Sequence, residues 1–205
     1  NRQTSTDNPD LKILYKAMNN LRSILPSFPI YQYMQEGFEA DDIIFQCAAE
    51  AHKFGSEIII ISNDSDLLQI VQRFPNTIQF DPKKNILMEA PHDYNIAVYK
   101  ALAGDSTDNV SGVKGIGKVT AEKWAAKVYG KKNGPLLKTI TELLKDNQEK
   151  VKQFQESFSL VDIESNPNLI DIKIDHDFLY KNKEFDVEKV KLFFEEHKMN
   201  AHLNN

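Results

Sequence analysis

The sequence predicts an α/β fold, in which a twisted mixed or parallel sheet is flanked by helices and followed by a helical region. Strand and helix signals alternate through the first half of the chain, as in proteins built around a parallel sheet. A run of four isoleucines, residues 58–61, is typical of a strand buried on both faces. Beyond about residue 90 the strand signals fade while helical periodicity continues.

Apolar spacing and turn residues place the elements of the first half. Leu14, Met18 and Leu21 recur at helical spacing after Pro9, and Gly55 ends the strongest helical pattern. Two short apolar runs around a polar Pro-Lys-Lys-Asn turn indicate a hairpin. In chain order, the predicted elements are a helix at 8–25, a strand at 30–34, a helix at 39–54, a strand at 57–62, a short helix at 66–71, and hairpin strands at 77–81 and 86–89.

The second half is predicted to be helical. Its expected helices cover residues 92–103, 118–129, 136–145, 149–161 and 186–197. Residues 164–177 show no clear period. These patterns divide the chain into an α/β core at 1–92, a helical region at 93–161, and a C-terminal segment at 162–205 that is expected to pack on the core.

Composition restricts the class of protein. The 205 residues are 41% hydrophobic and 27% charged, which excludes global disorder. The single cysteine, Cys47, cannot form an intrachain disulfide and indicates a reducing compartment. No apolar run of about 18 residues occurs, so no transmembrane helix and no membrane partner are expected.

Seven carboxylates fall into three clusters. Each cluster alone has a structural explanation, because acidic residues stabilise a helix N-terminus and Asp is a common turn former. The clusters are Glu39, Asp41 and Asp42 at the start of the strongest helix, Asp64 and Asp66 after the isoleucine strand, and Asp105 and Asp108 after a helix and a glycine.

Taken together, the clusters predict a metal site. Ligands of an open α/β sheet bind beyond the carboxyl ends of its strands, where these side chains are expected. Converging carboxylates repel unless cations neutralise them, and hard oxygen ligands select Mg²⁺ or Mn²⁺. Two such ions about 4 Å apart stabilise both oxygens that exchange in phosphodiester hydrolysis. No nearby His or Cys pair supports a structural zinc site instead.

Residues 112–121 form the most specific segment. Gly115 and Gly117 permit a tight turn before a helix, and such a turn presents backbone N–H groups to a phosphate. The stretch 111–132 holds six lysines and one glutamate, although the whole chain carries a net charge of −5. This local charge suits a nucleic-acid backbone, while a solvated lysine-rich helix is the alternative. Trp124 is expected to face the core; stacking on a base is the alternative. The spacing is similar to a helix–hairpin–helix and does not match a P-loop.

Four motifs occur in an order that resembles the bacterial and bacteriophage 5′-nucleases, a family that includes flap endonucleases, 5′→3′ exonucleases and the nuclease domain of DNA polymerase I. The resemblance covers roughly residues 1–160 and implies a PIN-like fold with a helix–three-turn–helix DNA-binding element. The motifs are Glu39-Ala40-Asp41-Asp42, Ser62-Asn63-Asp64-Ser65-Asp66, Gly104-Asp105-Ser106-Thr107-Asp108-Asn109 and Gly112-Val113-Lys114-Gly115-Ile116-Gly117.

The resemblance also implies roles for individual residues. All seven carboxylates are expected to be catalytic, with two divalent ions in the complete enzyme. The first ion would take Glu39 and Asp41, the second Asp64, Asp66, Asp105 and Asp108, with Asp42 bridging or in the outer shell. The DNA-binding set would be Lys114, Gly115, Gly117, Lys118, Thr120 and Lys123. Backbone carbonyls near Val113 and Ile116 would hold a monovalent cation such as K⁺.

The implied function is a structure-specific 5′-nuclease of DNA replication and repair, acting as a monomer on 5′-flap, nicked or branched duplex DNA. A bacterial or phage-infected cytoplasm is the implied setting. Family members carry a first strand with a metal-binding Asp, and a basic arch, before the counterpart of Asn1. We therefore expect an incomplete first metal site, so that this chain is a fragment, takes the rest from a partner chain, or binds without cutting.

Two alternatives stay open. One is a noncatalytic duplex-DNA-binding module that retains the hairpin. The other is an RNA-cleaving PIN-like nuclease with a similar acidic sheet. The hairpin favours DNA over RNA, because it suits the backbone of a duplex.

Overall fold

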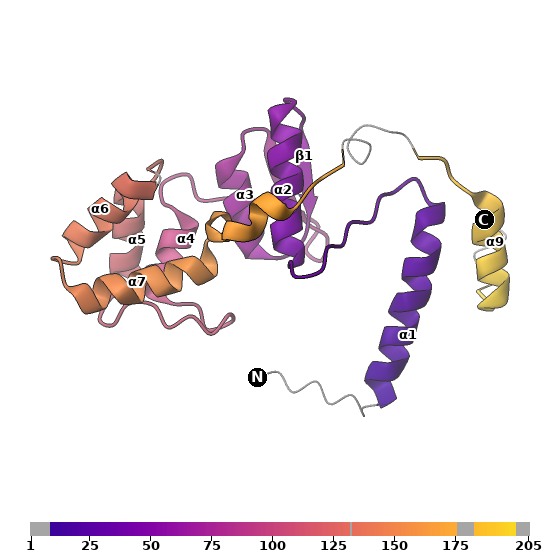
Figure 1. Ribbon diagram of the computed structural model, residues 1–205, viewed down its shortest axis with the longest axis horizontal. Helices are drawn as coiled ribbons and strands as arrows, with labels where there is room; N and C mark the ends of the chain where they lie inside the picture. The colour runs from indigo at the N-terminus through magenta and orange to yellow at the C-terminus, as the bar shows by residue number, and fades with distance from the viewer. Residues whose placement is uncertain (1–8, 132, 176–182, 200–205) are drawn as a thin grey trace. The chain divides into compact units, whose positions relative to one another are not determined.

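The structure is a computed structural model that describes residues 9–131, 133–175 and 183–199. The chain divides into two compact units, one made of Asn1–Met34 with Asp175–Asn205 and the other of Gln35–Ile174 (Figure 1). The three-part division expected from the sequence, at residues 92 and 161, stays a prediction. None of the described helices is long and apolar enough to cross a membrane.

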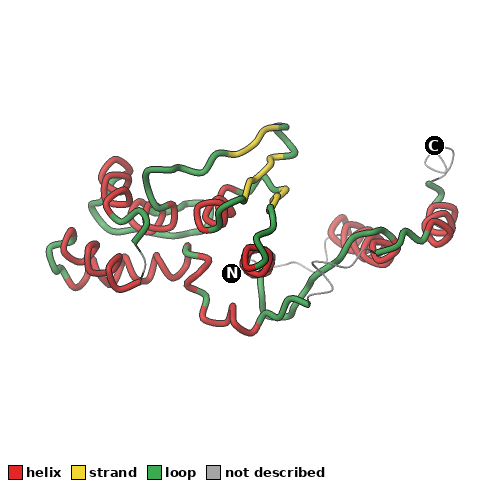
Figure 2. The backbone as a smooth tube through the Cα atoms, turned by 90° about the horizontal axis from the view of Figure 1, so that it is seen from above, coloured by secondary structure: helices red, strands yellow, loops and turns green. Residues whose placement is uncertain are grey.

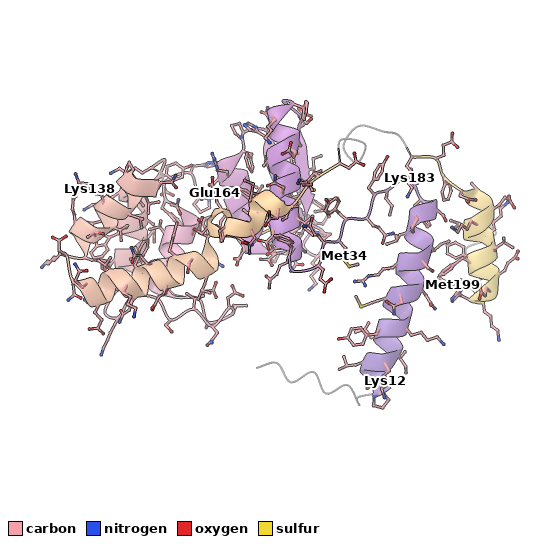
Figure 3. The ribbon with its side chains drawn as sticks, viewed as in Figure 1. Lys12, Met34, Lys138, Glu164, Lys183 and Met199 are labelled. Carbon is pink, nitrogen blue, oxygen red and sulfur yellow. The ribbon has the colours of Figure 1, made fainter. Side chains whose placement is uncertain are left out.

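The smaller unit pairs α1 (Pro9–Ile24) with α9 (Val187–Glu196). A 3₁₀ turn, η1 (Leu25–Ser27), with Pro26 inside it ends α1. The N–H of Asp186 donates to the Ser27 carbonyl at 2.8 Å, and the rings of Phe28 and Phe185 lie 5.3 Å apart. Figure 3 labels Lys12 near the start of α1 and Met199 just after α9. The two predicted terminal helices are thus confirmed.

The larger unit contains a three-stranded sheet of β1 (Ile58–Ile61), β2 (Thr77–Asp81) and β3 (Ile86–Met88) (Figure 2). β2 lies in the middle, parallel to β1 and antiparallel to β3. Asp81 closes the β2–β3 hairpin, since its Oδ1 accepts the N–H groups of Lys83 at 2.8 Å and Lys84 at 3.1 Å. The mixed sheet and the hairpin agree with the sequence prediction.

The prediction that the isoleucine strand is buried on both faces is wrong. Ile60 is 6% exposed, whereas Ile59 and Ile61 are 64% and 69% exposed. Side chains alternate between the faces of a strand, and β1 is an edge strand of the described sheet. α2 (Ala40–Lys53) packs beside β1, and the face that carries Ile59 and its β2 partner Ile78 is left open.

The predicted strand at residues 30–34 is also wrong. These residues form no regular element and pair with no strand in the described part of the chain. Ile30 and Tyr31 are residue types that favour β-strands, but such residues form a strand only where a neighbouring strand can hydrogen-bond to them.

Four helices form the other side of the larger unit: α4 (Ile96–Ala103), α5 (Lys118–Lys127), α6 (Asn133–Leu143) and α7 (Gln148–Val161). Leu102, Ala125 and Phe154 are among the fully buried residues of their shared core, and Trp124 packs against it. α4 begins later than predicted because Asn95 caps it, accepting the N–H of Val98 at 2.9 Å. The core-facing side of α5 is as predicted.

In the predicted aperiodic stretch, residues 164–177, the structure has two 3₁₀ turns, η3 (Ile163–Ser165) and η4 (Pro167–Asp171), which follow α7, and residues 176 and 177 lie outside the described part of the chain. In Figures 1 and 3 this segment runs from α7 to the side of α2, with Glu164 labelled on it. The structure therefore gives residues 162–174 a defined path within the larger unit.

Candidate metal and nucleic-acid site

The first acidic turn follows β1. Asp64 caps the 3₁₀ turn η2 (Ser65–Leu67), and its Oδ1 accepts the N–H of Asp66 at 2.9 Å. α3 (Leu68–Arg73) continues from it. The buried Gln79 of β2 donates from Nε2 to the carbonyls of Ser62 at 3.0 Å and Asp64 at 2.5 Å. The turn is thus held from the sheet as well as by its own cap.

The second acidic turn follows α4. The backbones of Asp105 and Val110 exchange two hydrogen bonds, of 2.9 and 2.8 Å, which close a loop around residues 106–109. Inside the loop, Oδ1 of Asp105 accepts the N–H of Thr107 at 2.9 Å. Gly104 and Gly112, both at positive φ, bring the two ends of the loop against each other. This closure fixes the positions from which Asp105 and Asp108 project.

The two turns bring three carboxylates together. One oxygen each from Asp66, Asp105 and Asp108 lies within 4.8 Å of the others; we call these residues the carboxylate cluster. The ammonium group of Lys100 in α4 contributes a positive charge to this cluster. Its Nζ lies 2.7 Å from Oδ2 of Asp105 and also hydrogen-bonds Oδ1 of Asp66.

The pKa shifts follow from this geometry. The hydrogen bond from Lys100 lowers the pKa of Asp105 below its ordinary value. Burial raises the pKa of Asp66, although Lys100 opposes the effect. Burial also acts to lower the pKa of Lys100, but its bonds to Asp105 and Asp66 outweigh it and raise that pKa. Lys100 therefore favours the ionised form of Asp105 and opposes the protonation of Asp66, while both carboxylates favour the charged form of the lysine.

The third acidic group is the start of α2. Glu39 and Asp42 form a reciprocal capping box, in which Oδ2 of Asp42 accepts the N–H of Glu39 at 3.2 Å. Burial, and then the negative charges of Asp64 and Asp66, raise the pKa of Asp41. Asp41 is thus repelled electrostatically by the acidic residues that follow β1. Within the described residues, Glu39, Asp41, Asp42 and Asp64 contribute no oxygen to the carboxylate cluster.

The donor set of the cluster fits a hard divalent cation. It offers carboxylate oxygens from two rigid turns and no sulfur or imidazole ligand. Burial, and after it repulsion between the acidic groups, raises the pKa values of Asp41 and Asp66, and a bound cation would oppose both effects. Lys100 supplies a single positive charge to Asp66 and Asp105, so it balances only part of the negative charge of the three clustered carboxylates. The assignment of individual residues to metal ions stays a prediction.

The glycine turn lies between α4 and α5. Gly115 has a φ of +85°, which only glycine adopts without strain, and Gly117 is the N-cap of α5. The predicted basic residues Lys114, Lys118 and Lys123 are exposed, while Thr120 is half-buried. The Val113 carbonyl already accepts the N–H of Ile116 at 3.0 Å, and its use for a monovalent cation stays a prediction.

Sequence reasoning missed Lys100, Gln79 and Asn166, whose contacts hold the acidic groups in place. A charged residue within the apolar helix that precedes Gly104 was a usable signal for Lys100. Gln79 alternates with the polar residues Thr77 and Asp81, a pattern typical of a solvated strand face, yet all three residues are buried. Asn166 donates a hydrogen bond to Asp42, which is 124 residues away in the sequence, and no local pattern predicts such a contact.

Residues 6–96 match the family model described as the 5′-3′ exonuclease, N-terminal resolvase-like domain. Residues 6–96 belong to the 5′-3′ exonuclease family. Two of the three acidic groups, at the start of α2 and after β1, fall inside this exonuclease domain. Asp105 and Asp108 of the carboxylate cluster, and the whole of the glycine turn, lie beyond it.

Curated relatives extend the family likeness further along the chain. DNA polymerase I of Rhizobium leguminosarum is 40% identical over 94 residues, or 42% of this chain and 9% of the polymerase. DNA polymerase I of Bacillus subtilis is 31% identical over 156 residues, or 70% of this chain and 17% of the polymerase. The chain therefore spans only a small part of these relatives.

Solved structures share the fold of this exonuclease domain and of the helices that follow it. A mutant T5 5′-exonuclease is similar with a TM-score of 0.55 and 16% identity, over 91% of this chain and 74% of that chain. A second structure, of divalent metal ions (zinc) bound to T5 5′-exonuclease, is similar with a TM-score of 0.53 over 93% of this chain and 71% of that one. The α/β architecture of a small sheet with flanking helices is thus shared.

Proposed function

We propose that this chain is the metal-binding and DNA-gripping part of a structure-specific 5′-nuclease that hydrolyses phosphodiesters of 5′-flap, nicked or branched duplex DNA. The observation that carries the proposal is the convergence of Asp66, Asp105 and Asp108 in the same unit as the glycine turn. Hard oxygen ligands beside a basic turn suit a reaction at a phosphate. The family of residues 6–96 and the polymerase I relatives support it.

The carboxylate cluster would hold one divalent ion, Mg²⁺ or Mn²⁺, together with Asp64. Glu39 and Asp41 would belong to the site of a second ion, with Asp42 behind them. When bound, such ions activate water and stabilise charge on the exchanging phosphate oxygens. The zinc-bound T5 5′-exonuclease supports divalent metal use without specifying Mg²⁺.

The chain's own residues would prepare this site. Lys100 favours the ionised forms of Asp66 and Asp105 and holds the two carboxylates beside each other. Gly104 and Gly112 fix the loop that carries Asp105 and Asp108. These groups hold the oxygen ligands in place before any ion or substrate binds, which reduces the ordering cost at binding.

The glycine turn would grip the duplex backbone away from the scissile bond. The exposed side chains of Lys114, Lys118 and Lys123 would supply positive charge, and the turn at Gly115 and Gly117 would present backbone N–H groups. Such contacts read the backbone and not the base sequence. A K⁺ ion near Val113 and Ile116 is part of this proposal.

One observation favours a second candidate, a noncatalytic duplex-DNA-binding module. Lys100 already bonds two of the three clustered carboxylates, so the cluster is partly compensated without an ion. In that case the acidic groups would serve stability, and the glycine turn would be the functional element.

The deciding experiment is cleavage of an end-labelled 5′-flap duplex by this chain, with and without Mg²⁺. Asp105→Asn is compared with the matched control Asp146→Asn, which changes an exposed aspartate at positive φ outside the cluster. Mg²⁺-dependent cutting that is lost in Asp105→Asn and retained in the control would support the nuclease, and it would show that the carboxylates of this chain suffice despite the incomplete first metal site that the sequence leads us to expect. Flap binding without cutting would support the DNA-binding module, and preference for an RNA flap of equal structure would support an RNA-cleaving nuclease.

A further inference from the structure

The segment Val161–Asp171, which we call the strap, fastens the end of α7 to α3, which follows the acidic turn after β1, and to α2, which begins with the third acidic group. Gln69 of α3 donates to the Val161 carbonyl at 2.9 Å. Arg73, also on α3, binds both carboxylate oxygens of Glu164 at 3.1 Å. The strap therefore has a defined register against α3, which begins directly after Asp64 and Asp66.

Beyond η3 the strap reaches α2. The Nδ2 of Asn166 donates to Oδ1 of Asp42 at 3.0 Å. The Oδ1 of the same amide accepts the N–H of Asn168 at 3.0 Å and caps η4. Because one end of the amide faces a donor and the other an acceptor, its orientation is determined by its partners.

Asp42 has both carboxylate oxygens engaged by protein donors. Oδ2 accepts the N–H of Glu39, and Oδ1 accepts the amide of Asn166. An amide donor orients a carboxylate without neutralising it, whereas a lysine or arginine would also cancel its charge. The charge of Asp42 therefore remains available to a cation while its geometry is held.

We propose that Asn166 is a positioning residue for the acidic end of α2, acting through Asp42. By holding Asp42, it sets the first turn of α2 and so the direction in which Glu39 and Asp41 project toward the acidic groups after β1. This inference rests on the proposed metal-dependent function, because its consequence is the affinity of the site for a divalent ion. Groups that orient metal ligands from behind typically contribute 10- to 100-fold in affinity.

The test uses Mn²⁺ binding by calorimetry, which requires no turnover. Asn166→Asp keeps the cap of η4 but replaces the donor toward Asp42 with a carboxylate. Asn168→Ala is the matched control, since Asn168 is an exposed asparagine two residues away whose contribution is a backbone N–H. We expect Asn166→Asp to weaken Mn²⁺ binding about 10-fold and the control to leave it unchanged, with metal-free melting temperatures recorded for both.

A cycle with Asp42→Asn shows whether Asn166 acts through Asp42. In that background, an aspartate at position 166 regains a donor opposite it, so Asn166→Asp should change Mn²⁺ affinity less than about 2-fold. An equal loss in both backgrounds, or no loss in the single variant, overturns the proposal. If the wild-type chain binds Mn²⁺ but cuts no flap, the nuclease proposal fails while this one is still decided. No Mn²⁺ binding by the wild type overturns both.

Discussion

The Nζ atom of Lys100 lies 2.7 Å from Oδ2 of Asp105, and the same ammonium group hydrogen-bonds Asp66. One lysine of α4 thereby joins the turn that follows β1 to the loop that follows α4. Its side chain is only 14% exposed, so solvent screens these ion pairs weakly. The position of Asp66 relative to Asp105 therefore depends on a residue in neither acidic motif.

Replacing this lysine should destabilise the metal-free chain. Lys100→Met keeps the length of the side chain but leaves the charges of Asp66, Asp105 and Asp108 uncompensated. We expect a loss of about 1–3 kcal/mol in the free energy of unfolding, measured by urea denaturation, because the pairs are largely buried. Mg²⁺ or Mn²⁺ should recover part of the loss. Lys127→Met, at an exposed position of α5, is the control and should change little.

The pKa shifts predict how stability depends on pH without metal. Burial and its acidic neighbours raise the pKa of Asp41, so the folded chain binds this proton more tightly than the unfolded chain. Stability from Asp41 is therefore present below its unfolded pKa and is lost as the pH rises through its folded pKa. Asp66 acts in the same direction. Denaturation at a series of pH values should show the free energy of unfolding rising as the pH falls from neutral toward the ordinary Asp value of 3.8.

Two variants separate the contributions in this pH profile. Asp41→Asn should flatten the rise between neutral and mildly acidic pH. Asp105 has the opposite sign, because Lys100 lowers its pKa; its stabilisation is present above the unfolded pKa and is lost as the pH falls through its folded pKa. Asp105→Asn should therefore remove a loss of stability that begins only near the ordinary Asp value of 3.8. A pH profile unchanged in Asp41→Asn would contradict the electrostatic account.

A methyl group at Gly112 should open the loop that carries Asp105. Gly112 has a φ of +70°, and a Cβ there would lie 2.5 Å from the backbone nitrogen of Gly104. We expect Gly112→Ala to cost about 2 kcal/mol or more in unfolding free energy, since two backbones must move apart. Gly134→Ala is the contrasting control. It lies within α6 with nothing near the added methyl group, so it should stabilise the chain by up to about 1 kcal/mol.

The lysines of the glycine turn should contribute to DNA affinity through charge alone. Lys114→Ala and Lys118→Ala should weaken binding to duplexes of any sequence, and each should reduce the slope of log affinity against log salt by about 1. Fluorescence anisotropy over a salt series measures both quantities. Lys53→Ala on α2, whose lysine is exposed and paired with Glu50, serves as the control. A salt slope that stays at the wild-type value in both variants would exclude the turn as the DNA contact.

The amino-acid sequence by itself determined the order of the elements and the residues that end them. Apolar periodicity identified α2 and α7, and the glycine at position 115 indicated a turn that needs positive φ. These features depend on neighbours within a few residues, because helix periodicity, caps and turns are local. The family likeness carried by the acidic motifs is readable at the same level.

Only the tertiary structure decided which of those side chains meet. Lys100 and Asp66 are 34 residues apart, and Asn166 and Asp42 are 124 apart. The single buried face of β1 also depends on which elements lie against it and not on its four isoleucines. Contacts over such separations arise from loop closure and packing, where the energy of many groups is shared and no short pattern in the chain records it.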